Sequence, residues 1–177
     1  GDDSEVDVTQ NGSDNTSGVT QNALDSAVNV MQAGTGNGST VGQTGDGSTV
    51  IVTQDSVLSG VGQTSTVAQS GDGSTTNVDQ SGSGNTSDVN QAGALSNTNV
   101  IQTGSLGDSI VSQSGAGSAV NITQGGSENT SSVLQSGSLS TTNVIQAGAG
   151  NGSTVGQSGS LSTVNVDQSG SANSSII

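Results

Sequence analysis

Residues 26–43 read SAVNVMQAGTGNGSTVGQ, and this stretch decides the fold. Its two halves, SAVNVMQ at 26–32 and NGSTVGQ at 37–43, place Val and Gln, with Ser or Asn, at every second position. A spacing of two is the periodicity of a β-strand, and it puts these side chains on one face. The four residues between the halves, AGTG at 33–36, suit a sharp reversal because glycine adopts dihedral angles that a Cβ disfavours.

The same pattern continues along the chain with a period of eleven residues. Fifteen glutamines follow this period in two runs. They are Gln10, Gln21, Gln32, Gln43, Gln54, Gln69, Gln80, Gln91, Gln102, Gln113, Gln124, Gln135, Gln146, Gln157 and Gln168. Two residues before each of them stands a β-branched apolar residue: Val8, Val19, Val30, Val41, Val52, Val67, Val78, Val89, Val100, Val111, Ile122, Val133, Val144, Val155 or Val166. The two kinds of half-repeat alternate, so the structural unit has 22 residues.

This repeat predicts an all-β fold, a β-solenoid of about eight 22-residue strand-turn-strand coils. The coils would stack about 4.8 Å apart as two facing parallel, in-register sheets, which is cross-β stacking. We expect a short acidic N-terminal tail at 1–3 and a single solenoid at 4–177. The one break in the period lies between Gln54 and Gln69 and predicts an extended turn at 55–62. Disorder and helix are disfavoured, because neither accounts for columns held in register or for β-branched residues at this spacing.

The inward columns contain amides as well as valine. In a stack locked in register, each side-chain amide can hydrogen-bond to the amides above and below, so a polar column can be buried with its groups paired. We therefore expect the fifteen glutamines to form an inward ladder and the fifteen Val and Ile residues to form an apolar core. A second inward ladder would consist of Asn15, Asn37, Asn85, Asn129, Asn151 and Asn173. None of the 14 acidic residues occupies an inward column, as the cost of burying a charge requires.

The composition excludes most chemistry. The 177 residues include no Lys, Arg, His, Cys or aromatic residue, and the net charge is −14. The chain thus lacks the common general bases, a thiol nucleophile and a Schiff-base amine, so we expect no enzyme, no catalytic residue, no metal site and no cofactor. We also expect no nucleic-acid partner and no membrane insertion, because no cation is present to neutralise phosphates and no segment is apolar enough.

The two ends of the predicted stack are expected to bind other copies of the chain. Only three residues precede the first repeat, and the sequence stops within a strand, so we expect uncapped strand edges that act as templates. Such a head-to-tail contact does not close, and it gives a filament. The expected subunit-end contacts are Val6, Val8, Gln10, Val164, Val166, Gln168 and Ile177.

These residues resemble the curlin repeat, Ser-x5-Gln-x-Gly-x2-Asn-x-Ala-x3-Gln. The first unit reads Ser4, Gln10, Gly12, Asn15, Ser17, Gln21, and the second reads Ser26, Gln32, Gly34, Asn37, Ser39, Gln43. The units at 74–91, 118–135 and 140–157 match equally well, whereas the unit at 96–113 has Gly107 in place of Asn. The chain departs from the family in having Ser where the family often has Ala.

The resemblance implies a major subunit of curli-like functional amyloid fibres in a biofilm matrix, with roles in adhesion and aggregation. It implies a secreted, extracellular protein at the bacterial cell surface that polymerises with itself. It also implies a nucleator subunit, a secretion pore and chaperones as partners, and polymerisation driven by the inward Ser, Gln and Asn.

The alternative is a monomeric β-solenoid segment of an adhesin or of an ice-binding or other surface protein. Two outward features are also open to two interpretations, added stack stability or lateral contact between filaments. One is an outward asparagine column, Asn29, Asn77, Asn99, Asn121, Asn143 and Asn165. The other is a set of leucines at one turn edge, Leu95, Leu139 and Leu161.

Overall fold

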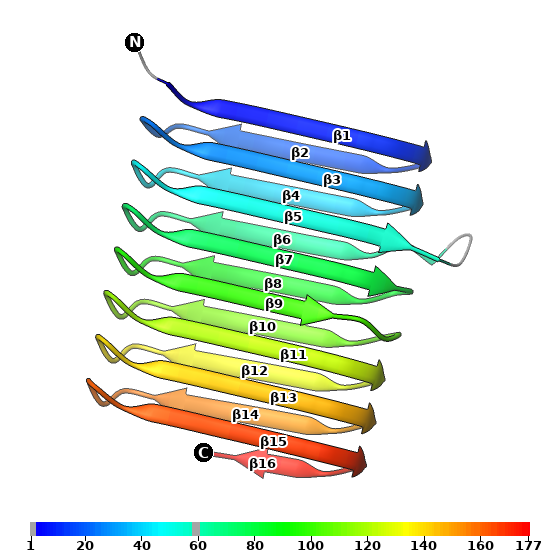
Figure 1. Cartoon of the computed structure of the whole chain (residues 1–177), viewed down its shortest axis with the longest axis vertical. Coiled ribbons are helices and arrows are strands. Elements are labelled where there is room, and N and C mark those ends of the chain that lie inside the picture. Colours follow the sequence, from blue (N-terminus) through cyan, green and yellow to red (C-terminus); the bar gives the residue numbers. More distant parts are fainter. Residues whose placement is uncertain (1–2, 58–60) are drawn as a thin grey trace.

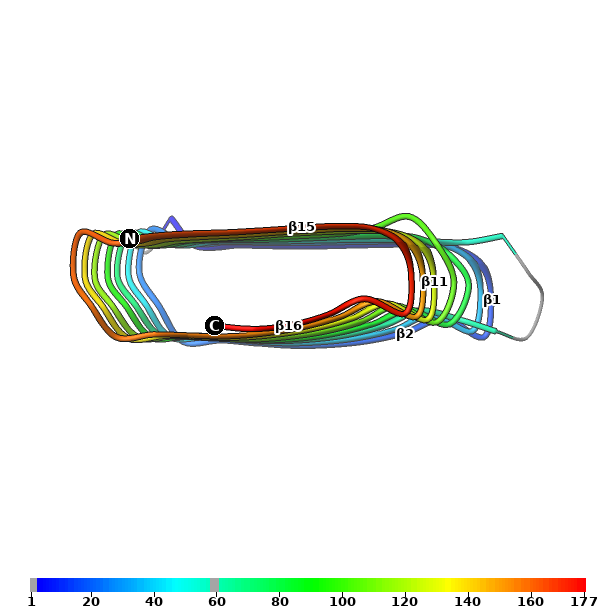
Figure 2. The same cartoon turned by 90° about the horizontal axis from the view of Figure 1, so that it is seen from below.

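The computed structural model describes residues 3–57 and 61–177, and it is a β-solenoid (Figure 1). The chain winds through eight coils, and each coil contributes one strand to each of two eight-stranded parallel sheets. No helix occurs in the described residues, and hence none that could cross a membrane. The predicted all-β solenoid of about eight coils is confirmed. Viewed along the stack, the two sheets lie face to face as two thin layers joined by turns at both edges (Figure 2).

The first sheet contains the odd-numbered strands and the second contains the even-numbered strands. The first comprises β1 (Glu5–Ser13), β3 (Ala27–Thr35), β5 (Thr49–Ser56), β7 (Thr75–Gly82), β9 (Asn97–Gln102), β11 (Ala119–Ser127), β13 (Thr141–Ala149) and β15 (Thr163–Ser171). The second comprises β2 (Thr16–Gln21), β4 (Gly38–Gln43), β6 (Thr64–Gln69), β8 (Thr86–Gln91), β10 (Asp108–Gln113), β12 (Thr130–Gln135), β14 (Gly152–Gln157) and β16 (Ser174–Ile176).

Identical columns stack without a register shift. Gln32 pairs with Gln54 across β3 and β5, and Gln54 pairs with Gln80 although the insertion separates them by 26 residues. The predicted turn at 55–62 begins later than expected, because Asp55 and Ser56 continue β5 and pair with β7. Residues 58–60 of that turn and 1–2 of the predicted acidic tail lie outside the described part of the chain.

Several strands of the first sheet also run past the glutamine into the predicted turn. In β3, three of the four residues at 33–36 remain paired, up to Thr35. The glycine in this segment makes the extension possible: Gly34 has a φ of 93° and lies directly against the backbone of Ser56 in the next coil. The two sheets are therefore joined at this edge by a tighter connection than the sequence indicates.

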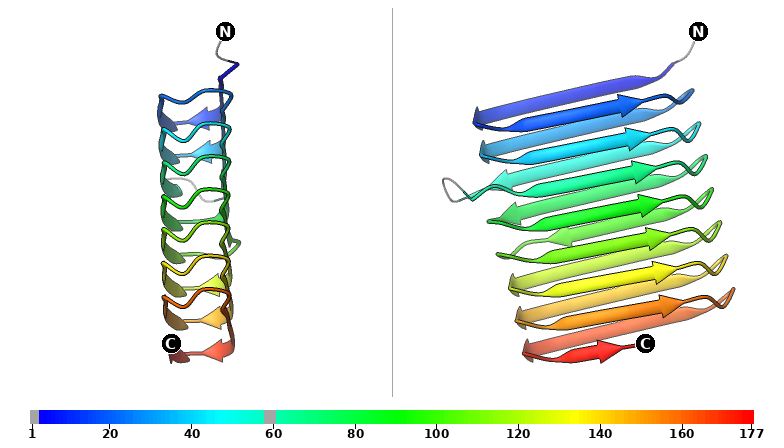
Figure 3. Two further views of the ribbon diagram at one scale, coloured as in Figure 1. Left: turned by 90° about the vertical axis from the view of Figure 1, so that its left-hand side faces the viewer. Right: turned by 180° about the vertical axis from the view of Figure 1, so that it is seen from behind.

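The core is a single thin layer of valine between the sheets. All central Val and Ile residues from Val30 to Val166 are buried, and they form one cluster. A second apolar column from the first sheet joins them, with Val28, Val50 and Val120 fully buried. The coils that lack valine in this column have threonine instead: Thr76, Thr98 and Thr142. No acidic side chain is buried among the described residues, so the charge lies outside the coils. Seen from the side, the two sheets form a narrow, straight stack of coils (Figure 3).

Candidate functional site

The glutamines form two continuous hydrogen-bonded ladders along the stack, one on each sheet. In every pair of successive coils, the Nε2 of the earlier Gln donates to the Oε1 of the later one, over 2.7 to 3.0 Å. The direction never reverses, so both ladders are polar along the stack axis. Most of these side chains are fully buried, and an amide can be buried at this depth when its donors and acceptors are paired. The exception is Gln157 at the end of its ladder, whose Nε2 is buried without a partner among the described residues.

The second amide hydrogen crosses the core to the opposite sheet. Gln80 Nε2 donates to the carbonyl oxygen of Thr64 over 3.0 Å, and Gln32 Nε2 donates in the same way to Thr16 over 2.9 Å. In the other direction, the hydroxyl of Thr76 donates to Gln91 Oε1 over 2.8 Å. The glutamines therefore bind successive coils together and also hold the two sheets at their short separation.

The inward asparagines form a different kind of ladder from the one the sequence predicts. Asn129 Oδ1 accepts from the backbone N–H of Asn151 in the next coil over 3.0 Å, and Asn129 Nδ2 donates to the carbonyl oxygens of Gly125 and Gly148. These amides thus bind turn backbone, because asparagine lies at the strand start, where turn groups have no strand partner. Gln63 occupies this column in the coil with the insertion: Asn37 Oδ1 accepts from its backbone N–H.

The serines form two inward columns with opposite hydrogen-bonding states. The column on the first sheet lies beside the turns, where Ser96 Oγ donates to the carbonyl oxygen of Gly115 in the next coil over 2.8 Å. The column on the second sheet lies in mid-strand, where the backbone carbonyls already belong to the sheet. Seven of its hydroxyls are buried without a hydrogen-bond partner among the described residues: Ser17, Ser39, Ser65, Ser87, Ser109, Ser131 and Ser153.

These two columns predict opposite effects of the same substitution. Ser109→Ala should raise the free energy of unfolding by about 1 kcal/mol, because it removes a buried hydroxyl that has no partner. Ser96→Ala should lower it by about 1–2 kcal/mol, because the Gly115 carbonyl loses its donor. Urea titration of both variants measures the two changes. A loss of stability in Ser109→Ala equal to that in Ser96→Ala would contradict the assignment.

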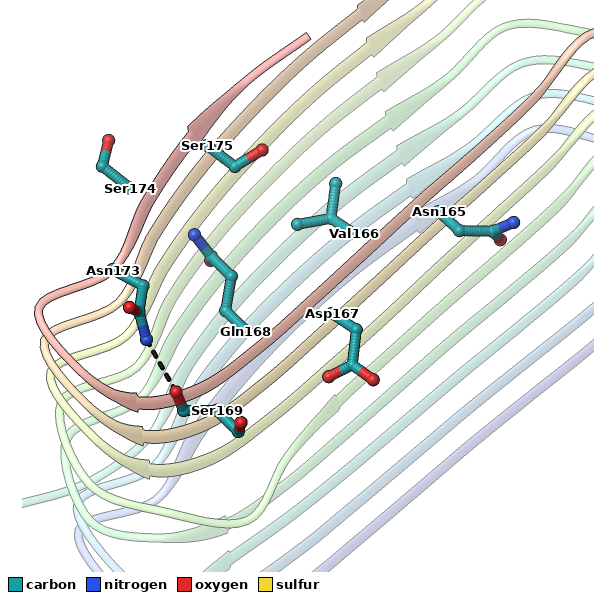
Figure 4. A pocket seen from close by; sticks show the side chains of 8 residues that line it. All are labelled: Asn165, Val166, Asp167, Gln168, Ser169, Asn173, Ser174 and Ser175. Carbon is teal, nitrogen blue, oxygen red and sulfur yellow. Dashed lines mark hydrogen bonds between the residues drawn. The ribbon is translucent and has the colours of Figure 1, made fainter.

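A hollow lies at each end of the stack. At the C-terminal end it has a volume of about 430 Å³ and lies between β15 and β16, with Val166 and Gln168 pointing into it and Asp167 pointing away (Figure 4). At the N-terminal end a hollow of about 390 Å³ is lined by Ser4, Gln21, the turn residues 22–24 and Asp46 from the next turn of the same edge. Each hollow has one residue of the glutamine ladders in its lining, Gln168 at the C-terminal end and Gln21 at the N-terminal end.

The residues that the sequence predicts as contacts at the two ends of the subunit differ in their exposure. Val6 and Ile177 are exposed, Val164 is half-buried, and Val166 and Gln168 are buried.

Several residues predicted to be buried in the core or ladders are more exposed. Val8 is 42% exposed and Gln10 is also exposed, although Gln10 still donates to Gln32. Val19, Gln21 and Asn15 are half-buried, and Asn173 is exposed. The cause is their position, because a terminal coil of the described stack has a neighbour on one side only.

The outward asparagine column also forms side-chain hydrogen bonds. Asn77 donates to Asn99 over 2.9 Å, and Asn121 and Asn143 each donate to the next residue of the column over 2.8 Å. Ile51 interrupts the column between Asn29 and Asn77. The sequence contains signals for the second valine column and for the inward serines, which share the spacing of two. It contains no signal that distinguishes the paired serines from the unpaired ones.

The fold and the ladders define a class of protein, a parallel β-solenoid whose coils are bound together by columns of hydrogen-bonded amides. Comparison with known families gives a more specific assignment: residues 1–34 and 24–55 match the curlin associated repeat. Residues 1–55 are therefore similar to curlin associated repeats, and the later coils continue the same columns in register. No curated protein matches the chain.

Proposed function

We propose that this protein is a structural subunit that polymerises head to tail into extracellular, curli-like amyloid fibres of a biofilm matrix, where it serves adhesion and aggregation. Its partners would be further copies of itself, a nucleator subunit, and the secretion pore and chaperones of the family. It would act at the outer surface of a bacterium and would catalyse no reaction. The match of residues 1–55 to the curlin associated repeat and the solenoid fold support this proposal.

The observation that carries the proposal is the single direction of the glutamine ladders. Gln168 accepts from Gln146 and donates to the Gly152 carbonyl, and no described residue receives its second amide hydrogen. At the other end, Gln10 donates to Gln32, and no described side chain donates to Gln10 Oε1. One end of the stack therefore offers donors and the other offers acceptors. A second copy in register would continue the ladder from Gln168 to its own Gln10.

The apolar columns support the same stacking. Val8 pairs with Val30 across β1 and β3, and every interior residue of this column is buried. Within one copy, the first coil has the same kinds of side chain in its columns as the second coil. The last coils continue these columns, so the first coil of one copy would fit onto the last coil of another. Stacking would bury Val8, and the burial of a valine side chain contributes about 1.5–3 kcal/mol.

A pair of neighbouring substitutions tests head-to-tail growth. Val8 and Thr9 are both exposed on β1, but only Val8 belongs to an inward column, whose interior members such as Val30 are buried. Thr9 belongs to the outward column of Met31, which stays exposed within the stack. Val8→Lys should leave the free chain folded and reduce filament elongation at least about tenfold, because growth would bury an unpaired charge. Thr9→Lys should elongate like the parent. Negative-stain electron microscopy and light scattering at moderate salt measure filament length and growth.

Two results would overturn the proposal. One is that the parent chain remains as discrete particles over days, which is the behaviour of a monomeric solenoid segment. The other is that Val8→Lys and Thr9→Lys elongate at the same rate, since the β1 edge would then not be the growing contact.

A further inference from the structure

One edge of the solenoid carries leucines in a backbone conformation that disfavours them. This edge contains the turns that lead from the second sheet to the first. Leu95, Leu139 and Leu161 there have φ values of 54°, 55° and 57°, in the left-handed region where residues with a Cβ are strained. Gly117 occupies the same position in an intervening turn with a φ of 65°.

Stacking imposes this conformation, but it does not account for leucine. The N–H of Leu139 donates to the Ala116 carbonyl over 2.9 Å, as the N–H of Gly117 donates to Ala94, so each turn copies the one before it. The side chain of Leu139 lies over the Cα of Gly117. Even so, Leu95, Leu139 and Leu161 remain 76%, 63% and 78% exposed. A strained backbone position that presents an apolar side chain to solvent indicates a surface with a role in binding.

The charge on this edge is divided along the stack. The first three turns each carry an acid, Asp25, Asp46 and Asp72, and all three are exposed. The last four turns, from β8–β9 to β14–β15, carry none, and three of these four contain the leucines. On a chain of net charge −14, this acid-free segment is where another copy can approach with the least like-charge repulsion.

We propose that these four turns, the leucine edge, form the lateral contact between neighbouring fibres, with the leucine edge of a second copy as the occupant. The contact would be self-complementary, with two antiparallel edges related by a two-fold axis, so that uncharged leucine turns face uncharged leucine turns. A basic partner would instead be attracted to the acidic turns and faces. This proposal rests on the proposed polymerisation.

The size of the edge determines when the contact forms. Three leucines and the small residues between them present far less than the ~800 Å² per partner of a stable interface. Two free chains should therefore not dimerise through it. In a fibre the same edge recurs in every subunit, and linked weak contacts add up to a strong one. Lateral pairing is thus expected of fibres and not of free chains.

The test replaces the leucines with a residue that their own column already contains. The triple variant Leu95→Gly, Leu139→Gly, Leu161→Gly keeps the net charge and suits the positive φ, as Gly117 does. Its fibres should elongate at the parent rate, but the fraction of paired or bundled fibres should fall at least about fivefold. Electron microscopy at moderate salt measures bundling, and light scattering of sheared seeds measures elongation.

A matched control removes three exposed apolar side chains elsewhere, again with residues found in the same columns. It is Leu106→Gly on the other turn edge, Leu134→Ser on the second sheet and Ile145→Thr on the first. This control should bundle like the parent. Equal loss of bundling in both triple variants, or parent-like bundling in the leucine-edge variant, would overturn the lateral contact while leaving polymerisation intact. A parent that forms no fibres would overturn polymerisation itself, and this proposal with it.

Discussion

Gly148→Ala is expected to destabilise the protein by on the order of 3 kcal/mol or more. Gly148 has a φ of 111°, and a Cβ there would overlap the carbonyl oxygen of Gly170 in the next coil. The obstacle is backbone, so it cannot move away as a flexible side chain could. The last coil should detach from the stack. Urea unfolding measures the lost stability, and limited proteolysis after β13 detects the detached coil.

The control for this prediction lies in the same turn. Gly150 also has a positive φ, 64°, but a Cβ there would meet no atom within 4 Å. Gly150→Ala should therefore cost only the strain of the left-handed backbone, about 1–2 kcal/mol. The difference between the variants isolates the close approach of successive coils. Equal destabilisation would show that backbone strain alone explains both glycines.

Gln124→Ala is expected to lower the free energy of unfolding by roughly 2–6 kcal/mol, because it leaves two buried groups unpaired at about 1–3 kcal/mol each. Gln124 accepts from Gln102 over 2.8 Å and donates to Gln146 over 2.9 Å, and its side chain is buried. The substitution interrupts the ladder in the middle of the stack. Fibre assembly should slow in parallel, since the same bonds join coil to coil.

Asn121→Ala is the matched control on the same strand, β11. Asn121 donates to Asn143 over 2.8 Å, but its column faces outward and water can replace the lost partner. We expect a change below about 1 kcal/mol and little effect on assembly. Urea midpoints and elongation rates of the two variants provide the comparison. Equal effects would show that inward and outward amides contribute alike.

The sequence by itself determined the coil, the register and the inward columns. In an in-register parallel stack, equivalent residues lie directly above one another, so each column must repeat a compatible side chain and the period becomes visible in the sequence. Val30, Gln32 and Asn37 identify three such columns from one coil, and all three are buried. The absence of acids from these columns has the same cause, because a charge there would be desolvated.

Spacing could not show which partner each polar group takes. Asn129 and Gln124 look equivalent in the repeat, yet the asparagine binds turn backbone and the glutamine binds glutamine. The reason is position: asparagine has a shorter side chain and lies beside the turn carbonyls, whereas Gln124 lies within strand β11 and faces its own column. The same difference in position separates Ser96 from Ser109. The Ser96 hydroxyl donates to a turn carbonyl, whereas the buried Ser109 hydroxyl has no hydrogen-bond partner.

Only the tertiary structure decided the state of the edges. Val8 and Val30 belong to one column, but Val8 is exposed because a strand on one side alone covers it. Leu139 occupies a position that glycine fills elsewhere, and the hydrogen bonds of the turn below it hold its backbone in the left-handed region. The sequence determines which side chains share a column, because equivalent positions recur at a fixed period. What a side chain meets above, below and beside it depends on the assembled stack.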